Sequence, residues 1–445
     1  MTLIIHRQLA KEAVMTEANL LLEQWIDDNP FITSLQMLKL TESELITRLS
    51  ARDDITPNYS TLPNSIKRIG LAKRFYVPPE YAFDLYNQIH HMILIGYLNR
   101  HPKTDDYDKY LNLVENGEVS IKDLPAPNTL IDAGTAMLCM GRSGHGKTTV
   151  FDKTLETFNC SDNFHIPSEN TGFRQLPQVM FVKTYIKSAT SKKAFLVSIL
   201  NAIDEKLNSR LTAKLPSRDT VGEQVIYVIK ICRMVGLGLL VIDDIQWIIN
   251  AKTTRDKNAV TNEFLEEFYN DLGVPMIFIG TPEAGELFSA PKQTEQSERR
   301  LISDGKFVLP DHSIEHTTWQ TMIWAIAVNY LGMTEKLVDK EFEHAIFYYC
   351  EGNISKLKRL VNHILLANLS MTKSNRFNSL YTAHVATHIR EESIKPKIPK
   401  VAITPAYSAE KTAQIDDKNT QKKDTKNQER IDRIKRLQEI DMGEE

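Results

Sequence analysis

Short apolar runs alternate with helix-like stretches through the middle of the chain. None of these runs is long enough for a helix, but each is typical of a buried strand. They lie at residues 135–140, 178–185, 237–243, 274–280 and 306–310. Strands that alternate with helices predict a parallel sheet covered by helices on both faces. We therefore expect an α/β fold over residues 126–311.

The segments on either side of this region show helical patterns without convincing strands. Residues 1–125 are polar and mainly helical in pattern, and residues 312–392 hold amphipathic stretches at 318–331 and 354–369. Residues 393–445 are rich in lysine, proline and aspartate, which is the composition of a disordered tail. The pattern thus predicts a helical N-terminal region, an α/β core, a helical lid and a charged tail with one short helix.

A glycine-rich turn follows the first apolar run. Gly141, Gly146, Lys147 and Thr148 fit the pattern G-x-x-x-x-G-K-[ST], with a strand pattern in front and a helical pattern behind. In such a loop backbone N–H groups converge on phosphate oxygens, the lysine reaches the β- and γ-phosphates, and the threonine hydroxyl binds Mg²⁺. The alternative is a chance glycine turn with a solvated lysine. We expect the loop to bind ATP through Gly141, Ser143, Gly144, His145, Gly146, Lys147, Thr148 and Thr149.

Two adjacent carboxylates, Asp243 and Asp244, end the apolar run at residues 237–243. Packing alone explains them poorly, because burying charges without partners is costly. Mg²⁺ is the natural partner of such a pair beside a phosphate-binding loop. We predict that Asp243 and Thr148 hold the ion and that Asp244 orients the attacking water. The alternative is a strand that ends in a solvated acidic turn.

Composition narrows the class of protein. The 445 residues allow more than one domain, and the net charge of -3 gives no overall sign of nucleic-acid binding. The four cysteines lie far apart in sequence, so neither a zinc site nor a disulfide framework is indicated. The N-terminus lacks the apolar run of a signal peptide, and no run is long enough to span a membrane. We expect a soluble, cytoplasmic protein without a membrane partner.

The phosphate-binding loop, the acidic strand and the helical lid together resemble the AAA+ superfamily of ATPases. The resemblance implies that nucleotide binds between subunits of a homo-oligomer. Thr281 stands where AAA+ proteins carry a polar sensor of the γ-phosphate. Arg299 and Arg300 stand where the family places an arginine finger that reaches a neighbouring subunit's nucleotide. A solvated arginine pair on a helix is the alternative.

The lid segment "CEGNISKLKRL", residues 350–360, resembles the second sensor motif of the same superfamily. Ser355 occupies the position where the motif has a basic residue, so Lys356 or Lys358 would substitute for it. We expect Lys356 to contact the nucleotide.

Four segments resemble TnsC and its relatives in the TniB group, the ATP-dependent regulators of DNA transposition. Two lie in the ATPase core, at residues 238–248 and 273–288; the more discriminating two are "DNPFITSL", residues 28–35, and "GYLNRHPKT", residues 96–104. The resemblance implies ATP-bound rings or helical filaments on double-stranded DNA, a target-selector protein, and transposase subunits contacted through the C-terminal part. Asp244 replaces the glutamate usual in the group, so slow hydrolysis is expected.

A run of basic residues extends from Lys183 to Arg218 with few acidic ones among them. Side chains after the second strand can neutralise phosphates without reading bases. We expect Lys183, Lys187, Lys192 and Lys193 to bind duplex DNA with little sequence specificity. A solvated basic face is the alternative.

The preferred function is therefore an ATPase that oligomerises on target DNA and recruits or activates a transposase. Two alternatives stay open. One is another AAA+ role, such as a helicase loader or a defence NTPase. The other is an ATP-gated scaffold in which turnover is negligible.

Overall fold

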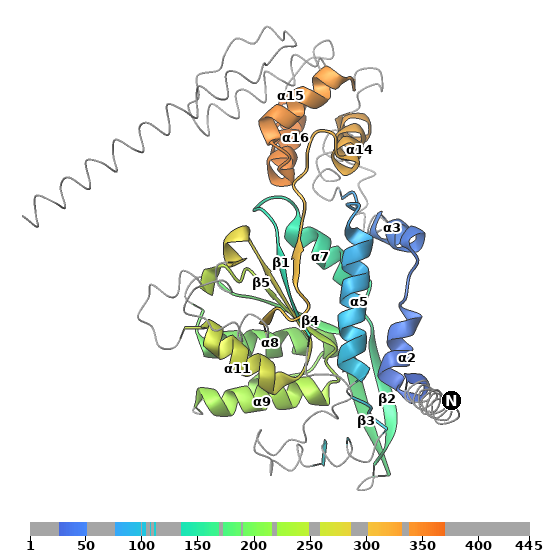
Figure 1. Cartoon of the computed structure of the whole chain (residues 1–445), viewed down its shortest axis with the longest axis vertical. Coiled ribbons are helices and arrows are strands. Elements are labelled where there is room, and N and C mark those ends of the chain that lie inside the picture. Colours follow the sequence, from blue (N-terminus) through green and yellow to red (C-terminus); the bar gives the residue numbers. More distant parts are fainter. Residues whose placement is uncertain are drawn as a thin grey trace, which may run out of the picture. The chain divides into compact units, whose positions relative to one another are not determined.

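The computed structural model describes most of the α/β core and parts of the chain on either side (Figure 1). The described residues are 26–50, 76–98, 100–103, 107, 111–112, 135–168, 172–187, 190–215, 220–248, 259–285, 301–331 and 338–369. Arg299, Arg300 and the tail of residues 393–445 lie outside the described residues, so what the sequence indicates for them stays a prediction.

Five parallel strands form the main sheet, in the order β4–β5–β6–β1–β7. They are β1 (Ala136–Met140), β4 (Phe181–Tyr185), β5 (Leu239–Asp243), β6 (Met276–Gly280) and β7 (Lys306–Val308). Because β6 lies between β1 and β5 and all three run in one direction, the loops that follow them meet at one edge of the sheet. The glycine-rich loop, Asp244 and Thr281 thus come together. The predicted α/β fold with a parallel sheet is confirmed.

A separate antiparallel hairpin, which the sequence pattern does not predict, consists of β2 (Ser161–Ser168) and β3 (Gly172–Val179). The apolar run at 178–185, expected to be one strand, is divided between β3 and β4. The backbone of Val179 explains the break: its N–H donates to Val235 at 3.0 Å and its carbonyl accepts from Gly238 at 2.9 Å. Periodicity alone cannot show that one apolar run serves two sheets.

Helices cover both faces of the main sheet (Figure 1). One apolar core contains residues of α8 (Lys192–Leu207), α9 (Val221–Met234) and α11 (Asn262–Leu272). The other contains residues of α2 (Pro30–Met37), α3 (Glu42–Ser50), α5 (Ala82–Leu98) and α7 (Lys147–Glu156). Leu240 and Ile242 of β5 belong to the first core, and Leu239 and Val241 to the second. Burial on both faces explains why the strands are apolar at successive positions.

The last described part of the chain is the helical lid that the sequence predicts. It consists of α14 (Thr317–Ala325), the π-helical stretch η5 (Ile326–Leu331), α15 (Lys340–Cys350) and α16 (Ile354–Leu369). These helices share an apolar core of their own around the fully buried Trp319. Two short 3₁₀ helices, η3 (Thr212–Lys214) and η4 (Pro282–Gly285), complete the description. Within the described residues, no helix is long and apolar enough to cross a membrane.

The two N-terminal segments that resemble TnsC are joined by buried hydrogen bonds. Asn29 caps α2 by accepting the N–H of Phe31 at 3.1 Å. The Asn29 amide also donates to the carbonyls of Tyr97 and Arg100, at 3.1 and 3.2 Å. The Phe31 ring stacks on that of Tyr97, and Arg100 donates to the Leu237 carbonyl, at 2.6 Å, just before β5. These contacts make the N-terminal helices part of the core that holds the acidic strand.

Candidate nucleotide site

The glycine-rich loop between β1 and α7 needs its glycines for two reasons. Gly144 and Gly146 have φ angles of 81° and 85°, in the left-handed region that other residues rarely adopt. A Cβ atom on Gly144 would also lie 2.6 Å from Oδ1 of Asn353 in the lid. The loop therefore takes its shape both from its own backbone and from the lid that contacts it.

The loop ends at the N-terminus of α7, which has no side-chain cap. Gly146 is the N-cap residue, so no side chain caps the N–H groups of the first turn. These groups and the helix dipole favour an anion at this end. Lys147, the first residue of α7, is also buried, with 8% of its surface exposed. A lysine in this mostly buried position at the positive end of a helix is unfavourable unless an anion accompanies it, and a phosphate group fits that requirement.

Thr148 and Asp243 lie side by side, although 95 residues separate them. The Thr148 hydroxyl donates to Oδ2 of Asp243 at 3.3 Å, and the Asp243 carboxylate is almost fully buried at the end of β5. A hydroxyl and a carboxylate are hard oxygen ligands of the kind that Mg²⁺ prefers, with phosphates supplying others. Among the described residues, no cluster of three or more His, Cys, Asp or Glu could hold a metal by itself. The donor set fits Mg²⁺ that arrives with a nucleotide.

Asp244 is linked to Thr281 through one glutamine side chain. Nε2 of Gln246 donates to Oδ1 of Asp244 at 3.0 Å, while Oε1 of Gln246 accepts the backbone N–H of Thr281 at 3.3 Å. One partner is an acceptor and the other a donor, so the amide has a single consistent orientation. Asp244 itself has a φ of 60°, a region that aspartate and asparagine tolerate better than glutamate does. This backbone gives a physical reason for the shorter carboxylate.

A polar cavity of about 330 Å³ lies beside the loop. Its lining consists of Arg142, Ser143, His145, Thr281, Pro282, Glu283, Glu351, Asn353 and Lys356. The Thr281 hydroxyl lowers the pKa of Glu283 by hydrogen bonding to its carboxylate. The cations at the rim are already paired: Arg142 lies 3.4 Å from Asp311, and Lys356 lies 2.7 Å from Glu351. Loop, sensor position and lid thus share one polar space.

The N-terminus of α16 contacts the glycine-rich loop directly. Asn353 precedes α16 and accepts the N–H of Lys356 at 3.0 Å, as a helix cap does. Its amide donates to the Ser143 carbonyl at 3.0 Å, and the backbone N–H of Ser355 donates to the Gly144 carbonyl at 3.0 Å. Ser355 therefore contacts the loop through its backbone, which does not need a basic side chain.

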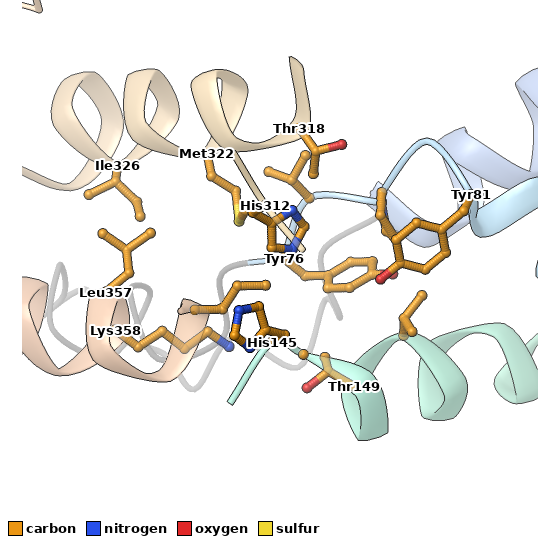
Figure 2. Close-up of a pocket in the computed structure, with 15 residues that line it drawn as sticks. Tyr76, Tyr81, His145, Thr149, His312, Thr318, Met322, Ile326, Leu357 and Lys358 are labelled. Atoms are coloured by element: carbon orange, nitrogen blue, oxygen red, sulfur yellow. The ribbon is translucent and has the colours of Figure 1, made fainter. Parts of the chain in front are cut away.

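An apolar pocket lies on the other side of the loop (Figure 2). Four separate parts of the chain contribute: residues 76–81, the loop and α7, the start of the lid, and α16. Figure 2 shows the rings of His145 and His312 facing each other, with the Lys358 side chain extending toward His145. The cavity between the side chains is small, about 30 Å³.

Two buried histidines dominate this pocket. The His145 and His312 rings lie nearly parallel, with an interplanar angle of 12° and centroids 6.3 Å apart. Burial lowers the pKa of His312 to about 4, and the nearby His316 and His145 contribute to the shift. Neither ring nitrogen of His312 makes a hydrogen bond of good geometry with the described residues, although the backbone of His145 lies close enough to oppose part of the pKa shift. A neutral imidazole with two unpaired nitrogens can bond to the edge of a polar ring.

Comparison with known proteins agrees with this geometry. Residues 131–288 match the family model of an AAA domain. The chain contains an AAA-type P-loop ATPase domain. No curated protein matches the sequence significantly.

Solved structures that resemble the fold come from distant proteins. One is Drosophila ORC bound to DNA, with 13% identity, a TM-score of 0.34, and coverage of 80% of this chain and 72% of that chain. Another is a Walker-type ATPase of Pyrococcus abyssi, with 11% identity, a TM-score of 0.36, and coverage of 64% of this chain and 73% of that one. Neither similarity bears on what this chain does.

The lysines expected to bind DNA fall into two groups. Lys183 lies inside the ATPase domain, between Asp152 and Asp243, and only 9% of its side chain is exposed. Such a position does not suit contact with DNA phosphates, because the ammonium is enclosed and paired. Lys187 and Lys193 are exposed, and Lys192 is half-buried, with its Nζ 5.4 Å from the centre of the Phe264 ring.

Sequence reasoning missed several residues of the site. Gln246 and Asn353 are polar residues without a motif of their own, and His312 lies in the connection to the lid. A signal existed only for Gln246, which follows the acidic pair by two positions on the same turn. The roles of Asn353 and His312 depend on contacts between segments more than 150 residues apart.

Proposed function

We propose that the chain is an ATP-dependent, DNA-binding regulator of transposition in the TnsC/TniB group. The observation that carries the nucleotide part is the meeting of the uncapped α7 N-terminus, Lys147, Thr148 and Asp243 at one edge of the sheet. In this proposal residues 1–125 form the N-terminal region, 126–311 the nucleotide-binding core, 312–392 the lid and 393–445 the tail that meets the transposase.

The loop residues Gly141 to Thr149 would bind the phosphates of ATP, with Lys147 on the β- and γ-phosphates. Thr148 and Asp243 would hold Mg²⁺, which neutralises charge on the transferred phosphate. Asp244, fixed by Gln246, would orient water, and Thr281 would sense the γ-phosphate through the same amide. Lys356 lines the polar cavity and would reach the phosphates only after leaving Glu351.

The apolar pocket would take the purine base. Its wall combines aromatic and aliphatic side chains with the unpaired nitrogens of His312, a lining that suits a flat heterocycle with polar edges. Because the present cavity, about 30 Å³, is too small for a purine, the base would have to part the lid side chains from those of α7. Nucleotide binding would therefore move the lid.

The start of α8 supports the DNA part of the proposal. Lys192 and Lys193 are the first two residues of this helix, whose first turn contains no acidic residue. Together with the exposed Lys187, they form a surface that can neutralise phosphates regardless of sequence.

Anisotropy of a labelled random-sequence duplex, with a non-hydrolysable ATP analogue or with ADP, tests this surface. Changing Lys187, Lys192 and Lys193 to alanine should weaken duplex binding at least about tenfold. The slope of log binding constant against log salt concentration should become less steep by about 2–3. The exposed Lys39, Lys103 and Lys340 give a control triple with the same change in charge. Equal losses in both triples would remove this surface from the proposal.

The transposition part rests on the resemblance of the two N-terminal segments, which the fold joins through Asn29. With ATP and duplex DNA, the protein should retain transposase subunits and a target selector encoded near it, and ADP should abolish the retention. Retention of a replicative helicase instead would favour a loader. Assembly with ATP but negligible phosphate release, with or without DNA, would favour the scaffold.

Arg299 or Arg300 is proposed to reach the nucleotide of a neighbouring subunit. The double alanine variant should then bind ATP normally but neither assemble nor hydrolyse it. Mixing it with Lys147→Ala protein should restore activity, because some interfaces pair an intact arginine with an intact loop. A mixture that stays inactive, although both proteins are folded and co-assemble with wild type, contradicts the assignment.

A further inference from the structure

Lys183 projects from β4 into the site between two carboxylates. Its Nζ lies 2.5 Å from Oδ1 of Asp152 on α7 and 3.0 Å from Oδ2 of Asp243 on β5. The side-chain exposure is 9% for Lys183 and 1% for Asp243, whereas Asp152 is 43% exposed. Strand register explains the contact: Lys183 pairs with Val241, so Asp243 lies two residues further along the same face of the neighbouring strand.

The ammonium of Lys183 is enclosed but not isolated, because carboxylates of two different elements lie within ion-pair distance of it. The Tyr185 ring, with its centre 5.0 Å from Nζ, adds a further favourable contact for a cation. A charge buried in this way persists only with its partners, so the three side chains form one unit.

Both oxygens of the Asp243 carboxylate are engaged. Oδ1 accepts the backbone N–H of Asp244 at 2.8 Å. Oδ2 accepts both the Thr148 hydroxyl, at 3.3 Å, and the Lys183 ammonium. Any divalent cation that used Asp243 as a ligand would therefore bind a carboxylate whose Oδ2 already carries a fixed positive charge.

We propose that Lys183 is an internal counter-ion of the Mg²⁺-binding carboxylate and that it lowers the affinity of the site for divalent cations. The inference rests on the proposed nucleotide function. Like charges repel strongly in a buried, low-dielectric site, so the ammonium opposes the metal. Asp152 is the second anchor, and it holds part of the ammonium's charge away from Asp243. Asp152 and Asp243 thus compete for the Lys183 ammonium, and this competition sets how tightly the site binds a divalent cation.

Removing the charge of Lys183 and removing the charge of Asp152 should change the affinity for divalent cations in opposite directions. Lys183→Met keeps the length of the side chain but leaves two carboxylates unneutralised, so the dissociation constant for Mn²⁺ should fall about tenfold. Asp152→Asn leaves the ammonium to Asp243 alone, so the same constant should rise about threefold or more. Lys39→Met, at an exposed site outside the nucleotide pocket, gives the charge control and should change nothing.

Mn²⁺ is titrated into each protein with saturating ADP, and free Mn²⁺ is read by electron paramagnetic resonance. Weaker or unchanged binding in a folded Lys183→Met protein would overturn the proposal, because a purely structural lysine predicts that result. If Lys183→Met does not fold, Asp152→Asn decides: unchanged or tighter Mn²⁺ binding then overturns it. A wild type that fails to bind a fluorescent ADP with Mg²⁺ contradicts the nucleotide function itself, which separates the two failures.

Discussion

The two sides of the glycine-rich loop are built in different ways. On the phosphate side, the polar groups lie at the ends of neighbouring strands and are held by hydrogen bonds, such as those of Asp244 and Gln246. On the base side, an apolar pocket is assembled from four distant parts of the chain around His145 and His312. The first side depends on sheet topology, whereas the second depends on where the lid packs. Changes on the phosphate side should therefore affect all nucleotides alike, and changes on the base side should discriminate between bases.

The largest effect is expected from Lys147→Ala. The phosphates lose their buried cation, so affinity for ATP and GTP should fall by about 100-fold or more, and by the same factor for both. Fluorescent-nucleotide titration measures this, with Lys153→Ala, a half-buried lysine of the same helix that pairs with Glu156, as the control. A loss confined to ATP would place the lysine on the base side and break the comparison.

Asp244→Asn and two changes at Gln246 should lower turnover and spare binding. Asp244→Asn should reduce the rate of phosphate release about 100-fold with nucleotide affinity unchanged.

Gln246→Met loses both hydrogen bonds, whereas Gln246→Glu keeps the acceptor for Thr281 but sets a carboxylate against Asp244. We expect about tenfold slower hydrolysis for Gln246→Met and a larger loss for Gln246→Glu. Wild-type rates in both variants would show that Gln246 does not position Asp244.

Asn353 connects the two sides, and two variants separate its two roles. Asn353→Asp keeps the cap of α16 but replaces the donor to the Ser143 carbonyl with a repelling oxygen, whereas Asn353→Ala loses both. Nucleotide affinity should fall about fivefold in both variants, because both lose the donor to Ser143. The melting temperature should fall only in Asn353→Ala, because only that variant loses the helix cap, which is worth about 1 kcal/mol. Wild-type affinity in Asn353→Asp would show that lid docking does not act on the loop.

The smallest effect is expected on the base side, from His312→Phe. The low pKa of His312, about 4 against an ordinary 6.5, means that between these pH values the unfolded chain binds a proton that the folded chain does not. This group therefore removes stability as pH falls from 6.5 toward 4. Thermal unfolding of His312→Phe should be less sensitive to pH over that window, and the preference for ATP over GTP should shift a few-fold. The exposed His344→Gln is the control, and pH sensitivity equal to wild type in His312→Phe would contradict the assignment.

The same difference decides which parts of the fold and of the site can be predicted from the sequence. The parallel sheet, the lid, and the adjacency of Thr148 and Asp243 follow from apolar runs and from motifs that mark strand ends. The hairpin of β2 and β3 does not, because part of it shares an apolar run with β4. Lys183 is a clear case: a lysine in a basic stretch looks solvated, and only strand register shows that it points at Asp243. The pocket around His312 leaves no local signal, because its walls meet only after the lid has packed.

The hydrogen bonds between the N-terminus of α16 and the glycine-rich loop fix the direction of peptide dipoles in that loop. In a trans peptide the carbonyl of one residue and the N–H of the next point in opposite directions. The lid receives the carbonyls of Ser143 and Gly144, so the N–H groups of Gly144 and His145 are turned away from the lid, and that of His145 donates to the Arg142 carbonyl at 3.3 Å. The lid thereby sets the orientation of two peptide planes in the loop, and a rotation of α16 would turn both. A helix that touches no phosphate can in this way set how strongly the loop attracts one.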